Sequence, residues 1–198
     1  GNAATQASWT FKVDTVAPTL SGTPMGWATV IKPDVVITAV EAGSGMNTGV
    51  GTFTLTGSIT GPILGSGSWD GTGLIYTWIP TGDLNENETY TAKMENAADV
   101  AGNAADTLTF TFQVDVTPPV INDASWNPGD GSWINTTAVV LTVEVTDTDG
   151  SGVDLASAAV DHTGVGTVGV LAYDPMTHQL TIPLSGLGEG AHTITLDI

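Results

Sequence analysis

Hydrophobic and polar residues alternate along many short stretches of this chain. Residues 106–115 read DTLTFTFQVD, which places leucine, two phenylalanines and valine on one face and threonine and glutamine on the other. Alternation with a period of two is typical of a β-strand with one buried face. Residues 5–14 read TQASWTFKVD and follow the same pattern, so a second strand of this kind is predicted there.

Seven further stretches rich in β-branched and aromatic residues are predicted strands. They lie at 35–40, 52–57, 74–80, 89–94, 138–145, 179–183 and 192–198. Clusters rich in glycine predict turns between strands, as in LGSGSWDGTG at 64–73 and WNPGDGSW at 126–133. No stretch shows sustained helical periodicity. Many short strands between turns favour an all-β chain built from β-sandwiches.

One phrase occurs twice in the chain. Residues 1–18 read GNAATQASWTFKVDTVAP and residues 102–119 read GNAADTLTFTFQVDVTPP, at a constant offset of 101 residues. A repeat of about 100 residues is the size of one immunoglobulin-like sandwich. We therefore predict that residues 1–16 are the last strand of a preceding repeat and that 17–115 form one domain. Residues 116–198 are predicted to form a second domain that lacks its final strand.

Charge is strongly one-sided. The chain has 21 acidic residues against Lys12, Lys32 and Lys93, and its formal net charge is -18. Binding nucleic acid needs basic residues, so nucleic acid is excluded as a partner. No apolar run reaches the roughly 18 residues of a membrane span, so no direct membrane insertion is expected. An acidic surface attracts cations, and calcium is the hard, oxygen-seeking ion most available outside cells.

Several short motifs mark the predicted strands and the junctions between repeats. D-x-AGN at 99–103 precedes a predicted last strand, SGM and SGV follow the second strand of each half, and L-x5-Y leads into the penultimate strand. VDTVAP and VDVTPP mark the junctions. With these motifs the chain resembles the bacterial Ig-like domains of microbial cell-surface proteins and adhesins. Residues 18–114 match best, whereas the second half lacks the AGN turn.

The resemblance implies tandem immunoglobulin-like β-sandwiches that act as a non-catalytic stalk or adhesion module of a larger cell-surface protein. Its partners would be neighbouring repeats of the same protein and an extracellular receptor or glycan. The alternative is a carbohydrate-binding or accessory module of a secreted hydrolase, with Trp126 and Trp133 exposed together beside Asp130. Packing in cores or junctions is otherwise expected for all six tryptophans. No catalytic motif is found, so no enzyme activity is expected.

Acidic residues are predicted to gather at one end of each sandwich. In the Ig-like strand order, the leading segment, the loop after the second strand and the loop before the last strand share that end. Calcium takes six to eight oxygen ligands, so each group is a candidate calcium site. In the alternative interpretation these residues only cap turns and lie in water. The candidate ligands are Asp14, Glu41 and Asp99 in the first domain, and Asp115, Asp147, Asp149 and Asp154 in the second.

Two further expectations concern the penultimate strand and the repeated phrase. Tyr90 is expected to anchor the corner before that strand, and His192 stands in its place in the second domain. The histidines show no spacing typical of a metal site or a catalytic base. Because the second domain is predicted to lack a strand that the chain carries at 5–14, strand exchange between copies is expected.

Overall fold

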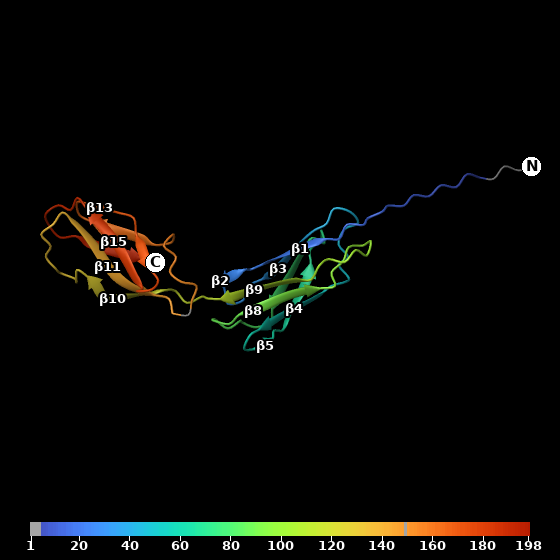
Figure 1. Ribbon diagram of the computed structural model, residues 1–198, viewed down its shortest axis with the longest axis horizontal. Helices are drawn as coiled ribbons and strands as arrows, with labels where there is room; N and C mark the ends of the chain where they lie inside the picture. The colour runs from blue at the N-terminus through green and yellow to red at the C-terminus, as the bar shows by residue number, and fades with distance from the viewer. Residues whose placement is uncertain (1–4, 149) are drawn as a thin grey trace, which may run out of the picture. The chain divides into compact units, whose positions relative to one another are not determined.

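The chain is all-β and divides into two compact units. The computed structural model describes residues 5–148 and 150–198, and every element in that part of the chain is a strand. Unit 1 comprises Gly1–Val116 and unit 2 comprises Thr117–Ile198. Each unit is built of short strands that pair antiparallel, except that β2 runs parallel to β9 in unit 1 (Figure 1). Within the described residues, no helix is long and apolar enough to cross a membrane.

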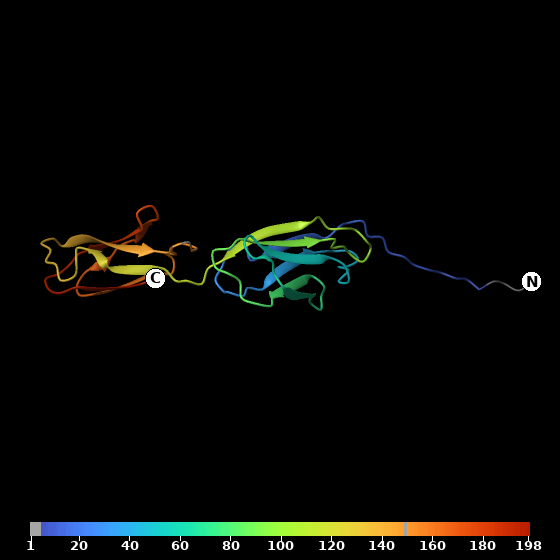
Figure 2. The same cartoon turned by 90° about the horizontal axis from the view of Figure 1, so that it is seen from below.

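Unit 1 is a sandwich of two sheets. One sheet has the order β1-β3-β7-β6, and the other has the order β2-β9-β8-β4-β5. These orders correspond to the A-B-E-D and G-F-C sheets of an immunoglobulin-like domain. Figure 2 shows this unit after a 90° turn, with β9 (yellow-green) along one side. The strands are β1 (Thr19–Thr23), β2 (Gly26–Ala28), β3 (Val35–Val40), β4 (Thr52–Gly57), β5 (Gly61–Pro62), β6 (Gly65–Trp69), β7 (Ile75–Pro80), β8 (Tyr90–Glu95) and β9 (Leu108–Val114).

The core of unit 1 follows from alternation along its central strands. Inward-facing residues of β3, β8 and β9 are almost fully buried, whereas their sequence neighbours point outward. Tyr90 stacks on Phe112 with ring centroids 5.5 Å apart, and Trp78 closes the core from β7. Strand β9 pairs with β8 on one side and with β2 on the other.

Unit 1 also buries a carboxylate, that of Glu88. Its Oε1 accepts hydrogen bonds from the backbone N–H groups of Ile59 and Thr60, both at 2.7 Å, and from the Thr60 hydroxyl at 2.9 Å. Its Oε2 accepts one from the Asn85 amide at 3.1 Å. Burial by itself raises the pKa of Glu88, but the hydrogen bonds outweigh burial and lower the pKa to about 2. Glu88 is therefore ionised at neutral pH although it is buried.

Unit 2 is a smaller sandwich. Its larger sheet has the order β10-β11-β15-β13, with β14 also paired to β15, and corresponds to the A-B-E-D sheet of unit 1. Its second sheet contains only β12 and β16 among the described residues. The strands are β10 (Val120–Asn127), β11 (Ala138–Thr146), β12 (Ala159–Thr163), β13 (Thr167–Val168), β14 (Ala172–Asp174), β15 (Gln179–Ser185) and β16 (Thr193–Asp197).

The two cores differ in completeness. In unit 2 the fully buried apolar residues come mainly from β11 and β15, whereas Val160, Ile194 and Leu196 of the other sheet are only half-buried. In unit 1 both sheets contribute fully buried residues. The second sheet of unit 2 therefore covers its core less well than the corresponding sheet of unit 1.

Most of the predicted strands are confirmed, but two predictions about local structure are wrong. Residues 5–14 form no strand, because no neighbouring strand offers them a ladder of backbone hydrogen bonds. The predicted turn at 64–73 contains strand β6, which pairs with β7. Glycine is needed in this strand because a Cβ at Gly65 would meet the Trp78 ring, and one at Gly67 would meet Tyr76.

Candidate metal centre

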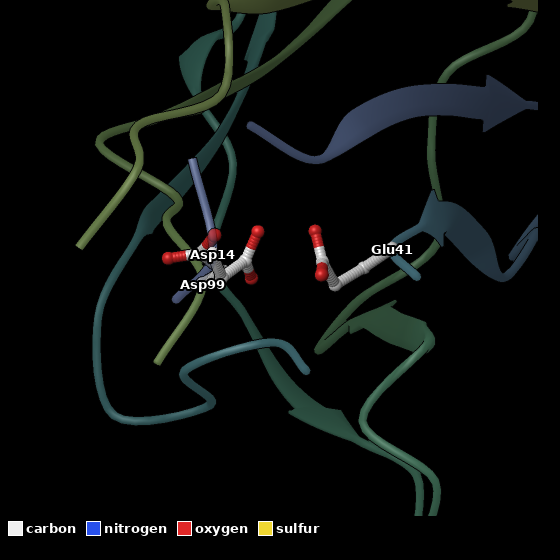
Figure 3. Close-up of side chains that lie close together, drawn as sticks. All are labelled: Asp14, Glu41 and Asp99. Atoms are coloured by element: carbon white, nitrogen blue, oxygen red, sulfur yellow. The ribbon is translucent and has the colours of Figure 1, made fainter. Parts of the chain in front are cut away.

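Three predicted ligands meet at one end of unit 1. Asp14, Glu41 and Asp99 each offer a carboxylate oxygen, and these oxygens all lie within 4.8 Å of one another. Asp14 comes from the segment that leads into β1, Glu41 from the loop after β3, and Asp99 from the loop between β8 and β9. Figure 3 shows the carboxylate of Glu41 on one side and those of Asp14 and Asp99 on the other.

Asp99 is the fixed part of this group. It is fully buried, and its Oδ1 accepts a hydrogen bond from the backbone N–H of Asn103 at 2.8 Å. Its Oδ2 accepts a second bond from the Asn103 side-chain amide at 2.7 Å. The D-x-AGN turn closes in this way around the aspartate, and Gly102 supplies the positive φ of 95° that the turn requires.

Asp14 ties the leading segment to the body of unit 1. Its carboxylate accepts hydrogen bonds from the backbone N–H groups of Ser44 at 2.6 Å and of Val16 at 3.1 Å. The bonds from Ser44 and then Val16 lower the pKa of Asp14 below its usual value. The amide of Asn103 also donates to the backbone carbonyl of Asp14 at 3.2 Å. A side chain at Gly43 would displace the Asp14 carboxylate, so the glycine leaves room for it there.

Glu41 completes the group without a cationic partner. The backbone N–H of Gly43 donates to Glu41 Oε1 at 2.6 Å. In the described part of the chain, no lysine or histidine forms an ion pair with any of the three carboxylates. Carboxylates this close repel one another, and a bound cation would relieve the repulsion.

The donor chemistry of this group fits calcium. All three side chains are carboxylates, which suit hard cations, and no imidazole or thiolate is among the ligands. Carboxylate oxygens that accept one hydrogen bond keep a lone pair for a metal ion. Three carboxylates supply part of the six to eight oxygens that calcium takes, and backbone carbonyls and water commonly provide the rest.

The described members of the second predicted set in unit 2 accept hydrogen bonds from their own loops. In unit 2, the Asp147 carboxylate accepts a hydrogen bond from the backbone N–H of Gly152 at 2.6 Å, and that of Asp154 accepts one from Ala156 at 2.9 Å. Both therefore cap their own turns. Asp115 belongs to unit 1, where it is buried and its backbone N–H donates to Ala28. Asp149 lies outside the described residues.

The tryptophans divide into buried and exposed groups, so the expectation that all six would be packed is wrong. Trp9 is 81% exposed and Trp133 is 98% exposed. Trp126 packs against the core of unit 2. The paired, exposed platform that sugar binding would require of Trp126 and Trp133 is therefore not formed.

The corner before the penultimate strand is built differently in the two units. The Tyr90 hydroxyl accepts a hydrogen bond from the backbone N–H of Asn85 at 2.6 Å, as expected for an anchoring tyrosine. At the corresponding place, His192 Nε2 lies 2.9 Å from the Gly188 carbonyl, and His192 Nδ1 lies 3.0 Å from His162 Nε2. Spacing along the sequence does not indicate this histidine pair, because only the pairing of β12 with β16 brings the rings together.

Sequence reasoning also missed residues that hold the candidate metal centre. Ser44 bonds Asp14 through its N–H, and its hydroxyl accepts a hydrogen bond from Ala101 at 3.0 Å. It therefore connects the leading segment with the loop that carries Asp99. The SGM motif pointed to this loop but not to this contact.

Comparisons with known proteins identify no family. No family model and no curated protein matches the chain. Among solved structures, the N-terminal part of the bacterial S-layer protein SbsC is 15% identical with a TM-score of 0.41, over 91% of this chain and 43% of that one. A fragment of titin is 10% identical with a TM-score of 0.33, over 92% and 95%. The chain thus spans less than half of the S-layer structure, and these similarities are too low to indicate a function.

Proposed function

We propose that this chain is a non-catalytic, extracellular part of a larger microbial cell-surface protein, in which Ig-like units are strung into a stalk or adhesive array. Each sandwich adds length, and its hydrogen-bonded sheets resist extension. Pro118 and Pro119 restrict the backbone of the short segment between β9 and β10. The sequence resemblance to bacterial Ig-like domains is the reason for placing the protein at the cell surface.

We further propose that calcium binds Asp14, Glu41 and Asp99. The observation that carries this proposal is that carboxylates from three separate segments converge where the leading segment joins unit 1. A preceding unit in a longer array would be connected through this segment. An ion held by all three side chains would fix the segment to the sandwich and stiffen the junction.

Thermal unfolding with calcium and with EDTA tests the calcium site. A ligand present at 100 times its Kd stabilises the folded state by about 2.7 kcal/mol, so calcium is expected to raise the unfolding midpoint of unit 1 by several degrees. Glu41→Gln is expected to abolish most of this rise. Asp34→Asn, which neutralises an exposed carboxylate outside the group, is the matched control and should keep it. Equal midpoints in calcium and EDTA for the unmodified chain would contradict the site.

A glycan array distinguishes the proposed stalk function from the alternative function of carbohydrate binding. The proposed stalk binds no glycan through its tryptophans, so Trp133→Ala should leave the array signal unchanged. Saturable binding of one sugar class that disappears in Trp133→Ala would favour the carbohydrate-binding module instead.

A further inference from the structure

We propose that His162 and His192 bind a divalent copper ion in unit 2. The protein ligands are two imidazole nitrogens, and water fills the remaining positions of the ion. This site differs from the candidate calcium centre in its unit and in its chemistry, because calcium takes oxygen ligands whereas imidazole suits copper. The inference goes beyond the proposed stalk function and does not depend on it.

The pairing of two strands brings the imidazoles onto one face. In the antiparallel pair of β12 and β16, His162 lies directly opposite Ile194. Residues opposite each other share a face of the sheet, and so do residues two positions apart along one strand. His192 is two residues before Ile194, so the two histidines are diagonal neighbours on the same face. Their ring centroids are 5.2 Å apart, and the ring planes differ by 16°.

The two rings meet through one nitrogen each. His162 Nε2 lies 3.0 Å from His192 Nδ1. Two nitrogens at this separation, each about 2.0–2.1 Å from one ion, subtend an angle of roughly 95° at that ion. Such an angle suits the tetragonal geometry of Cu²⁺, which is also the divalent first-row ion that binds a given set of nitrogen ligands most strongly. A tetrahedral ion such as Zn²⁺ requires the nitrogens to move apart to about 3.3 Å.

The other ring nitrogen of His192 determines which of its atoms is free to bind a metal ion. His192 Nε2 lies 2.9 Å from the carbonyl oxygen of Gly188, which can only accept a hydrogen bond. Nε2 therefore carries the proton, and Nδ1 of the neutral ring directs its lone pair towards His162. Histidines that bind metals almost always donate their second ring N–H to a carbonyl, a carboxylate or water. This contact is separate from the proximity of the two rings, and it too points to a ligand role.

His162 changes its tautomer when the ion binds. Without metal, its Nε2–H donates to His192 Nδ1. With metal, the proton moves through water to Nδ1 of His162, and the lone pair freed at Nε2 binds the ion. Both imidazoles stay neutral, so the number of bound protons does not change. The ion therefore replaces one hydrogen bond between the rings.

Two glycines keep the space beside these nitrogens clear. A Cβ at Gly164 would lie 2.7 Å from His192 Nδ1, and one at Gly166 would lie 2.9 Å from His162 Cε1. A larger residue at either position would push into the rings. The backbone around the pair therefore leaves both imidazoles room for the small rotations that binding one ion requires.

The charge of unit 2 favours a cation. All three lysines of the chain lie in unit 1, and residues 117–198 contain ten acidic residues and no lysine or arginine. A field of one sign raises the local concentration of ions of the opposite sign. Metal cations are therefore attracted to the unit that carries the histidine pair.

Pulsed EPR of the full chain with one equivalent of Cu²⁺ tests the site. The unmodified chain should show the nuclear modulation of two copper-bound imidazoles. His162→Ala and His192→Ala should each show at most one and bind Cu²⁺ more than about tenfold more weakly, since loss of even a hydrogen-bond partner of a ligand costs about 10–100-fold. His178→Ala, which removes the third histidine of unit 2, is the matched control and should keep both. Fewer than two imidazoles in the unmodified chain, or the same loss in His178→Ala, would overturn the proposal.

NMR of the histidine rings in the unmodified chain tests the same atoms without a substitution. Zn²⁺ also binds imidazole and is diamagnetic, so it serves as a probe in place of copper. Excess Zn²⁺ should shift the nitrogen signals of His162 Nε2 and His192 Nδ1, whereas His192 Nε2 should keep its proton. Binding through other ring nitrogens, or no shift of either ring, would overturn the proposal.

Discussion

The same phrase has opposite structural states at its two occurrences in this molecule. In residues 106–115 it forms β9, with its aromatic side chains buried and its backbone paired on both sides. In residues 5–14 it forms no strand, and its aromatic side chains are exposed. An alternating pattern therefore shows which face of a segment can be buried. Whether a strand forms depends on a neighbouring strand edge.

The penultimate strand is buried more deeply in unit 1 than in unit 2, and this difference also depends on a neighbouring strand. Unit 1 has a closing strand, and its penultimate strand is buried around Tyr90. Unit 2 has no such strand among the described residues, and its penultimate strand remains half-buried. Where unit 1 has the buried Glu88 two residues before Tyr90, unit 2 has Gly190 before His192.

Replacing Phe112 or Phe11 with alanine should give the largest difference in the free energy of unfolding between the two copies of the repeated sequence. Phe112→Ala removes a buried ring from a packed core, and such changes cost about 3–5 kcal/mol of unfolding free energy. Phe11→Ala removes an exposed ring and should change the stability of unit 1 by less than about 0.5 kcal/mol. Denaturant unfolding followed by NMR signals of β9 measures both values. Similar costs for the two changes would contradict the comparison.

Glu88→Gln should destabilise unit 1 next most strongly. The change removes the charge that several donors share, and buried hydrogen bonds lost in this way cost about 2–3 kcal/mol. The loss should appear in signals of unit 1, because Glu88 and the groups that donate to it all lie in that unit. Unchanged stability of unit 1 would contradict the stabilising role of Glu88.

The stability that Glu88 contributes to unit 1 should depend on pH, because folding lowers the pKa of this residue. Folding lowers the pKa of Glu88 from its usual 4.5 to about 2, so the ionised group stabilises unit 1 fully above pH 4.5. That contribution decreases as the pH falls below 4.5 and is lost near pH 2. The stability difference between the unmodified chain and Glu88→Gln should therefore narrow over this range. A difference that stays constant down to pH 2 would contradict the assigned role.

Among the three changes in the unit 1 core, Tyr90→Phe should have the smallest effect. It removes the hydroxyl that bonds Asn85 and donates to the Glu88 carboxylate at 3.2 Å, but it keeps the ring on Phe112, so a cost of about 1–2 kcal/mol is expected. Burial, and then the nearby Glu88 charge, raise the pKa of Tyr90 to about 12, so this hydroxyl stays protonated at neutral pH. A cost comparable to that of Phe112→Ala, in the same denaturant experiment, would show that the corner is more than a local anchor.

Much of the fold could be predicted from the sequence because its strong signals are local. Strands with β-branched and aromatic alternation, such as 52–57, were predicted with their observed bounds. Strand β6 was missed because its glycines suit a turn, and the need for glycine arises from Trp78 and Tyr76 on the neighbouring strand. That reason is visible only once the sheet is assembled.

The candidate site was predictable only in part. The Ig-like strand order predicted that Asp14, Glu41 and Asp99 lie at one end of the first domain. In the structure their carboxylate oxygens lie within 4.8 Å of one another. The contacts of Ser44, the burial of Glu88 and the pair of His162 with His192 depend on chain segments that are distant in sequence. No local pattern specifies such contacts.

The central claim is that the repeated sequence forms a paired, buried strand within residues 106–115 but forms no strand at 5–14. Hydrogen exchange by mass spectrometry tests it most directly. Amides of 108–114 should exchange slowly, because they belong to a paired strand, and those of 6–13 should exchange as fast as in an unstructured peptide. Slow exchange of 6–13, or fast exchange of 108–114, would contradict the claim.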